Sequence, residues 1–201
     1  SISNLNNIDF HGIRESFKLI ADKRNMNFNI YNTGEIPKII ILVSKFDHCL
    51  VDLLYRVKNG ELKVEVKAII SNHSDTYDLA KSYNIPFHHI EVTKDNKKEA
   101  EVEIESLISK YDVEAIILAR YMQILSEEMS EKFSSRIINI HHSFLPSFKG
   151  ASPYKQAHKR GVKLIGATAH FVTSDLDEGP IIEQDVTRVT HITSSFDMIA
   201  A

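Results

Sequence analysis

The sequence has little of what several classes of protein need. Its 201 residues include a single cysteine, Cys49, which excludes a disulfide framework and a thiolate cluster for zinc. No apolar run approaches the roughly 20 residues that cross a bilayer, and no secretion signal is visible. The formal net charge is −3, so no basic excess points to nucleic acid. We therefore expect a cytoplasmic protein that binds neither membrane nor nucleic acid.

The chain shows two regions with different patterns. In residues 1–36, apolar positions follow helical spacing over 10–20, and apolar and polar residues alternate over 26–30, as in a strand. A helix and a strand alone bury little apolar surface. We therefore interpret residues 1–36 as part of a small α+β module with a linker, and residues 37–201 as a separate domain.

From residue 37 onward, strand patterns alternate with helix patterns. The run Ile39–Val43 is apolar throughout, which is typical of a strand buried on both faces. The alternation predicts an α/β fold with a doubly wound, mostly parallel sheet of Rossmann type and right-handed crossovers. We expect the last two strands to pair antiparallel at one edge. The predicted strands are 39–43, 64–70, 88–92, 115–118, 137–140, 164–172 and 181–189, and the predicted helices are 49–57, 76–83, 97–111, 127–133 and 153–160, with a final helix capped by Ser194 or Ser195.

Polar residues stand at the end of the apolar strand 137–140. Asn139 and His141 are two residues apart, so in an extended chain they project from one face, where open α/β sheets bind ligands. An amide N–H can stabilise an oxyanion and an imidazole can transfer a proton, so the pair suits acyl chemistry. The alternative is that both residues only satisfy hydrogen bonds within the fold.

A second polar segment, Thr173–Pro180, follows the next predicted strand. Asp177 precedes a Gly-Pro turn that can aim its carboxylate inward. Beside His141, this carboxylate would orient the imidazole ring and stabilise its charged form. The alternative is a solvated acidic turn, which suits Asp175 and Glu178 better. For Asp177 the residues alone leave both interpretations open.

Three motifs lie between residues 120 and 180. They read Arg-Tyr-Met-Gln-Ile-Leu at 120–125, Asn-Ile-His at 139–141 followed by Ser143 and Leu145-Pro146, and His-Phe-Val-Thr at 170–173 followed by Leu-Asp-Glu-Gly-Pro at 176–180. Together, in order and spacing, they resemble the motifs of the folate-dependent formyltransferases. The resemblance runs from Lys38 to the end of the sequence. It is specific as a set, although each motif alone is weak.

Within that superfamily the chain is most similar to the formyltetrahydrofolate deformylases. His142 and Phe144 stand where the purine-pathway transformylases usually have Pro and Leu, and the segment at 44–50 also matches the deformylase pattern. The resemblance implies a formyltransferase-like catalytic domain at 37–201, truncated at its C-terminal end. It also implies that residues 1–36 correspond to the last helix and strand of an ACT-type module.

The resemblance further implies a reaction and a site. Water attacks the formyl carbon of 10-formyltetrahydrofolate, and formate and tetrahydrofolate are released in support of purine synthesis and one-carbon balance. The implied catalytic residues are Asn139 as oxyanion donor, His141 as proton carrier, and Asp177, which orients His141. The implied substrate-binding residues are Met122, Gln123, Ile124 and Leu125 around the pterin, Thr173, Asp175 and Leu176 in the second loop, and His142 in support. No cofactor and no metal are implied, and we expect a homo-oligomer.

Several alternatives stay open for these residues. The apolar side chains at 122–125 can equally be core. A metal site is conceivable, although adjacent histidines are poorly placed to share one ion. Its ligands would be His141, His142, His170 and Asp177. The other histidines are expected to be structural. A catalytically silent folate-binding protein is a further alternative, against which the presence of all three motifs counts.

The alternative reaction is formyl transfer to an amine such as glycinamide ribonucleotide. Enzymes of that kind bind the phosphate of their acceptor with a glycine-rich turn after the first strand. Here that turn, residues 44–49, has no glycine. Phe46 would crowd a phosphate and Asp47 would repel it, although Lys45 could attract one. The sequence therefore favours water as the nucleophile.

Overall fold

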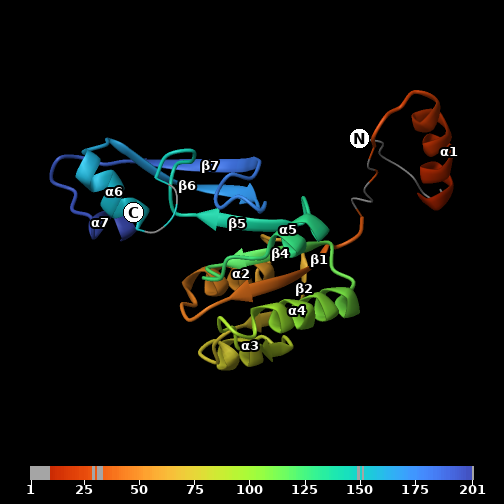
Figure 1. Cartoon of the computed structure of the whole chain (residues 1–201), viewed down its shortest axis with the longest axis horizontal. Helices are drawn as coiled ribbons and strands as arrows, with labels where there is room; N and C mark the ends of the chain where they lie inside the picture. The colour runs from red at the N-terminus through yellow and green to blue at the C-terminus, as the bar shows by residue number, and fades with distance from the viewer. Residues whose placement is uncertain (1–9, 29, 31–33, 149, 151, 201) are drawn as a thin grey trace. The chain divides into compact units, whose positions relative to one another are not determined.

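The computed structural model describes residues 10–28, 30, 34–148, 150 and 152–200 (Figure 1). The chain divides into two compact units, Ser1–Ile36 and Pro37–Ala201. Among the described residues no helix is long and apolar enough to cross a membrane.

The first unit contains helix α1, Phe10–Lys23, which confirms the helix predicted there. The predicted strand at 26–30 is wrong, since no described residue of this unit lies in a strand. A strand needs a hydrogen-bonding partner, and the described part of the unit offers no second strand. Phe28 instead packs its ring edge-on against Phe17 of α1, with the ring centroids 4.9 Å apart.

The second unit is built on one sheet. Its described strands are β1 Lys38–Val43, β2 Glu65–Ser71, β3 Phe87–His89, β4 Ala115–Ala119, β5 Ile137–His141, β6 Leu164–Phe171 and β7 Ile181–Arg188. Its described helices are α2 His48–Lys58, α3 Tyr77–Ser82, α4 Lys97–Tyr111, α5 Glu127–Lys132, α6 Pro153–Arg160 and α7 Asp197–Ala200. The strand order is β3-β2-β1-β4-β5-β6-β7, parallel from β3 to β5 and antiparallel from β5 to β7. The predicted doubly wound, mostly parallel fold is confirmed, including the antiparallel edge.

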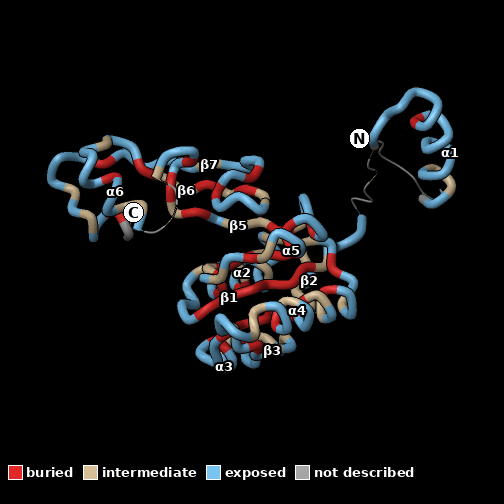
Figure 2. The backbone as a smooth tube through the Cα atoms, viewed as in Figure 1, coloured by how far each residue is buried: buried red, intermediate tan, exposed pale blue. Residues whose placement is uncertain are grey.

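Two apolar clusters cover the two faces of the sheet. The strand β1 between them is buried along most of its length (Figure 2). The central strand β1 supplies both, because alternate residues of a strand face opposite sides. Ile40 and Leu42 pack with α4 and α5, where Ile104 is fully buried, whereas Ile41 packs with α2 around Leu50. Burying such a side chain contributes about 1.5–3 kcal/mol. The continuous apolar run predicted to be buried on both faces is therefore the centre of the core.

Strand β3 differs from its prediction. The pattern predicted residues 88–92, whereas β3 covers Phe87–His89. The strand is limited by its neighbour, since β2 ends at Ser71, which pairs with His89. The backbone of Ile90 makes the last hydrogen bond, to the carbonyl oxygen of Ser71 at 2.9 Å. Tertiary pairing therefore ends this strand, and the apolar pattern beyond it packs into the core without a strand partner.

The C-terminal part of the sheet carries the shorter helices α6 and α7. Helix α6 begins with Pro153 at its first turn, as predicted. Before α7, the hydroxyl of Ser194 accepts from the backbone N–H of Asp197 at 3.1 Å, and the Asp197 carboxylate accepts from the N–H of Ser194 at 2.9 Å. This reciprocal cap confirms Ser194 as the start signal of the last helix.

Candidate active site

The carboxyl ends of the parallel strands form one edge of the sheet, where open α/β sheets bind ligands. Asn139 and His141 lie in the second half of β5, at this edge. Asn139 is half-buried and His141 is 9% exposed. Because the two residues alternate along an extended strand, their side chains reach one group of neighbours, formed by His170 and Asp177.

The His141 ring faces an oxygen atom at each of its nitrogens. Nδ1 lies 3.4 Å from Oδ2 of Asp177, and Nε2 lies 3.1 Å from the carbonyl oxygen of Phe148. A carbonyl oxygen only accepts hydrogen bonds, so Nε2 carries a proton. Asp177 faces the other ring nitrogen, where its carboxylate can orient the imidazole and balance a positive charge that develops during a reaction.

Asp177 is held inside by its backbone as well as by its partners. Its side chain is 5% exposed and its backbone is left-handed, with φ +57°. Aspartate tolerates this region better than most residues. The backbone N–H of Gly150 donates to Oδ2 at 3.1 Å. Gly179 lets the turn close, because a Cβ there would lie 1.7 Å from the carbonyl oxygen of Phe171. The Gly-Pro turn thus aims the carboxylate inward.

His170 joins Asn139 to Asp177. In the sequence it stood out only within a motif and as a conceivable metal ligand, not as a catalytic or substrate-binding residue. It is 2% exposed and pairs with Asn139 across the antiparallel strands β5 and β6. Its Nδ1 lies 2.9 Å from the carbonyl oxygen of Phe171 and therefore donates. Its Nε2 then accepts from Nδ2 of Asn139 at 3.3 Å and lies 3.7 Å from Oδ1 of Asp177. This tautomer fixes the orientation of the Asn139 amide and leaves its second N–H for a ligand.

The loop after β5 is fixed by a buried hydroxyl. Thr168 of β6 is fully buried, and its Oγ1 donates to the carbonyl oxygen of Ser143 at 2.7 Å. The same Oγ1 accepts from the backbone N–H of Leu145 at 3.1 Å and from Nε2 of Gln184 at 3.0 Å. Thr168 therefore holds the loop whose Phe148 carbonyl contacts His141.

The predicted pterin segment follows β4 and mixes exposed with buried side chains. Met122 and Ile124 are 66% and 62% exposed, and Gln123 is half-buried. Leu125 instead packs into the core beneath α4 and α5. The backbone N–H of Met122 donates to Oγ of Ser44 at 2.9 Å, which ties this segment to the end of β1. Met122 and Ile124 can therefore contact a flat ring, whereas Leu125 mainly anchors the segment.

The second predicted substrate segment lies in the loop between β6 and β7. Asp175 and Leu176 are exposed, and Oγ1 of Thr173 donates to the carbonyl oxygen of Asp175 at 3.1 Å. Val172, just before this loop, packs against the same core cluster as Leu125. The two predicted pterin segments therefore border one apolar cluster.

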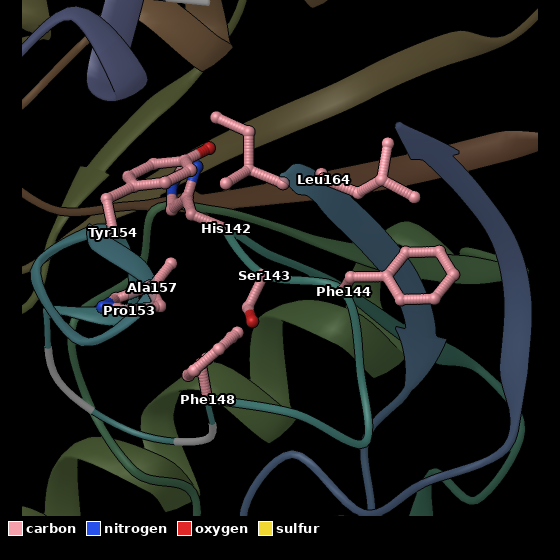
Figure 3. Close-up of a pocket in the computed structure, with 10 residues that line it drawn as sticks. His142, Ser143, Phe144, Phe148, Pro153, Tyr154, Ala157 and Leu164 are labelled. Carbon is pink, nitrogen blue, oxygen red and sulfur yellow. The ribbon is translucent and has the colours of Figure 1, made fainter. Parts of the chain in front are cut away.

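His142 points to a different place from His141. Its ring lies 6.4 Å from that of Tyr154, centroid to centroid, at a small hollow between the loop, α6 and β6 (Figure 3). Phe144 and Leu164 line the other side of this hollow. None of the three predicted catalytic residues lines it. Burial lowers the pKa of His142, and nearby positive charges lower it further, so the neutral ring is favoured.

Metal binding was the alternative for the histidines and Asp177. In the part of the chain that the structure describes, no group of three His, Cys, Asp or Glu side chains is arranged to hold a metal ion. The contacts of His141 and His170 are instead with one carboxylate and with backbone oxygens. The arrangement suits proton transfer and oxyanion stabilisation.

The chain is similar to proteins of known family over most of its length. The formyl transferase family model matches residues 37–201. A formyltetrahydrofolate deformylase of Corynebacterium sp. (strain P-1) is 49% identical over 189 residues, which cover 94% of this chain and 66% of that protein. The one from Bacillus subtilis (strain 168) is 48% identical over 190 residues, which cover 91% and 63%. The chain thus spans about two thirds of the length of these curated relatives.

Solved structures agree with the sequence relatives. The crystal structure of a formyltetrahydrofolate deformylase from Burkholderia mallei superposes with a TM-score of 0.90 and 50% identity, covering 98% of this chain and 70% of that one. A glycinamide ribonucleotide transformylase from Symbiobacterium toebii gives a TM-score of 0.76 and 30% identity, covering 86% and 83%. The fold, the site motifs and both comparisons lead to one conclusion, and the chain belongs to the formyl transferase family.

Proposed function

We propose that this chain carries the catalytic domain of a formyltetrahydrofolate deformylase, which hydrolyses 10-formyltetrahydrofolate to formate and tetrahydrofolate. The contact group of Asn139, His141, His170 and Asp177 carries the proposal. It offers one amide N–H, one imidazole that can transfer a proton and one buried carboxylate at the ligand edge of the sheet. The names of the relatives at 48–49% identity support the same reaction.

The proposed reaction needs one nucleophile and one leaving group. The oxygen of a water molecule bonds to the formyl carbon, and the free N–H of Asn139 donates to the oxyanion that forms. The bond from carbon to N10 then breaks. His141 gives its Nε2 proton to N10 and regains one from the attacking water, while the second water proton leaves when formic acid ionises. Asp177 keeps the ring oriented throughout.

Formyl transfer to glycinamide ribonucleotide is the less favoured alternative. The turn between β1 and α2 has no glycine, and Phe46 there lies over the guanidinium of Arg120, with Cζ 5.2 Å from the ring centroid. A phosphate cradle needs backbone N–H groups that a ligand can approach closely. Phe46 is 57% exposed and takes up space beside this turn. Water needs no such cradle, so this turn is compatible with hydrolysis.

The test is an assay without any acceptor. The protein is incubated with 10-formyltetrahydrofolate alone, and tetrahydrofolate and formate are measured together. We expect both products in equal amounts, and we expect glycinamide ribonucleotide to leave the rate unchanged. Asn139→Ala should lower kcat by about 10²–10³, as for the loss of one oxyanion donor. A rate that depends on the amine would mean transfer and would overturn the proposal.

The proposal extends to the setting of the enzyme. We propose a cytoplasmic homo-oligomer that needs no cofactor, because the folate is its substrate. We also propose that residues 1–36 are the end of an ACT-type module, on the resemblance of their helix to that module. Gel filtration with light scattering tests the oligomer. Activity that survives treatment with a metal chelator tests the absence of a metal requirement.

A further inference from the structure

The strand order reverses between β1 and β4, and this switch point is where doubly wound sheets form their ligand crevice. Ser44 follows β1 and Arg120 follows β4. The backbone N–H of Ser44 donates to the carbonyl oxygen of Arg120 at 3.3 Å, and Oγ of Ser44 accepts from the N–H of Met122 at 2.9 Å. The two strand ends are thus tied together, and Arg120 stands at the crevice.

The guanidinium of Arg120 is oriented but not neutralised. Its Cζ lies 5.2 Å from the centroid of the Phe46 ring, and its Nη1 lies 3.4 Å from Nε2 of His48. Its Nε is buried and has no hydrogen-bond partner. Arg120 as a whole is only partly buried, so its terminal nitrogens are the atoms that a ligand would meet. Among the described residues no carboxylate forms an ion pair with it.

The backbone of Arg120 has an unfavourable conformation. Its φ is +58°, a left-handed conformation that glycine adopts freely and that other residues adopt at a cost. A non-glycine residue in this region, next to a ligand edge, points to function rather than to stability. A buried donor without a partner adds to this cost. Arg120 therefore combines an unfavourable backbone conformation with a buried, unpaired Nε–H.

The charges around Arg120 favour an anion. His48 is the first residue of α2, so the positive end of that helix dipole lies at the same place. Burial lowers the pKa of His142, and the charge of Arg120 lowers it further. Asp47 is the acidic residue of the same turn and is exposed, while Asp52 is engaged by Arg56 at 2.8 Å.

We propose that Arg120, with His48 beside it, binds a small planar anion, and that this anion is the formate released by hydrolysis. The identity of the anion rests on the proposed function. Residues Leu118 and Asn139 pair across β4 and β5, so Arg120 lies two residues beyond the partner of the oxyanion donor. Guanidinium and carboxylate are complementary in shape and charge. Formate that leaves Asn139 would therefore meet the guanidinium of Arg120 at the end of β4.

The proposal is tested by binding, without folate. ¹³C-labelled formate is titrated with the protein, and the line width of its NMR signal gives the Kd. Formate has three non-hydrogen atoms, which limits the Kd to about 1 mM at best. In Arg120→Asn the charge is gone, but asparagine tolerates the left-handed backbone, so the fold is kept. We expect binding at least tenfold weaker in this variant, with an unchanged or higher melting temperature.

Two matched variants of the same turn separate a site from general attraction. Lys45→Asn removes an exposed charge and should change the Kd by less than twofold. Asp47→Asn removes the opposing charge and should tighten binding. Equal binding by wild type and Arg120→Asn, or competition by chloride at equal ionic strength, would overturn the proposal. Hydrolysis is measured separately, so formate binding without hydrolysis would reject only the proposed function, and hydrolysis without formate binding only this inference.

Discussion

Replacing Asp177 by asparagine is the sharpest test of the contact group around His141. The change keeps the size of the side chain and removes its charge. Asparagine also tolerates the left-handed backbone of this position, with φ +57°. The hydrogen bond from Gly150 to Oδ2, 3.1 Å long, can persist with the amide oxygen as acceptor. The variant is therefore expected to fold, and its effect should fall on His141.

The expected magnitude follows from what His141 loses. Asp177 lies 3.4 Å from the His141 ring, where it would balance the charge that develops on the imidazole, and both side chains are nearly excluded from water. A hydrogen bond to a charged partner contributes about 1.5–3 kcal/mol. Since about 1.4 kcal/mol corresponds to a factor of ten in rate, kcat/KM should fall by about 10- to 150-fold. The KM should change less, because the exposed side chains Met122 and Ile124, the expected ring contacts, are untouched.

The assay is the release of tetrahydrofolate from 10-formyltetrahydrofolate without an acceptor, with the melting temperature measured in parallel. Glu178→Gln is the matched control, because Glu178 is exposed in the same loop and is not assigned to the site, so kcat/KM should stay within about twofold, as for surface changes. If Asp177→Asn retained wild-type activity with a normal melting temperature, Asp177 would not act through His141. The mechanism proposed above would then be wrong.

Three further predictions follow from contacts of the same region. Thr168→Val should lower the free energy of unfolding by about 1–3 kcal/mol, because it leaves the carbonyl oxygen of Ser143 unpaired, whereas Thr168→Ser should retain most stability in urea denaturation. Gly179→Ala should destabilise by about 1–3 kcal/mol and abolish hydrolysis, because its Cβ would overlap the carbonyl oxygen of Phe171; a wild-type melting temperature would contradict this. The pKa of His142 is lowered by burial, so the unfolded state binds the extra proton and stability should fall as pH drops below the ordinary value of 6.5. In His142→Gln, the melting temperature should depend less on pH below 6.5. The same pH dependence as in the wild type would contradict a buried neutral ring.

The alternation of elements could be predicted because it depends on local patterns. The apolar run of β1 and the Pro at the start of α6 each carry their own signal. The end of β3 carries none, because the length of β2 decides it. The strand expected at 26–30 failed for the same kind of reason, since an alternating pattern cannot show whether a partner strand exists. What one segment determines alone is therefore visible in the sequence, and what two segments determine together is not.

The same distinction holds for the candidate site. Asn139 and His141 share a face because of strand geometry, which spacing reveals. His170 became part of the group only because β6 runs antiparallel to β5 and pairs it with Asn139, and no local pattern shows that register. Leu125 was expected near the pterin, yet packs into the core, because exposure depends on what covers a side chain. The catalytic roles assigned to these residues stay predictions.

Backbone conformation links the two parts of the ligand edge. Asp177 and Arg120 both have left-handed φ angles, of +57° and +58°. Aspartate adopts this conformation more often than most residues, and the sequence around Asp177 contains a turn signal. Arginine rarely adopts this conformation, and the sequence around Arg120 contains no turn signal. The unfavourable backbone at Arg120 is therefore visible only in the structure. Because a glycine at position 120 would relieve the backbone, the presence of a charged side chain there favours a role for the charge itself. If an Arg120→Gly variant were more stable and still bound formate, the Arg120 charge would have no role in formate binding.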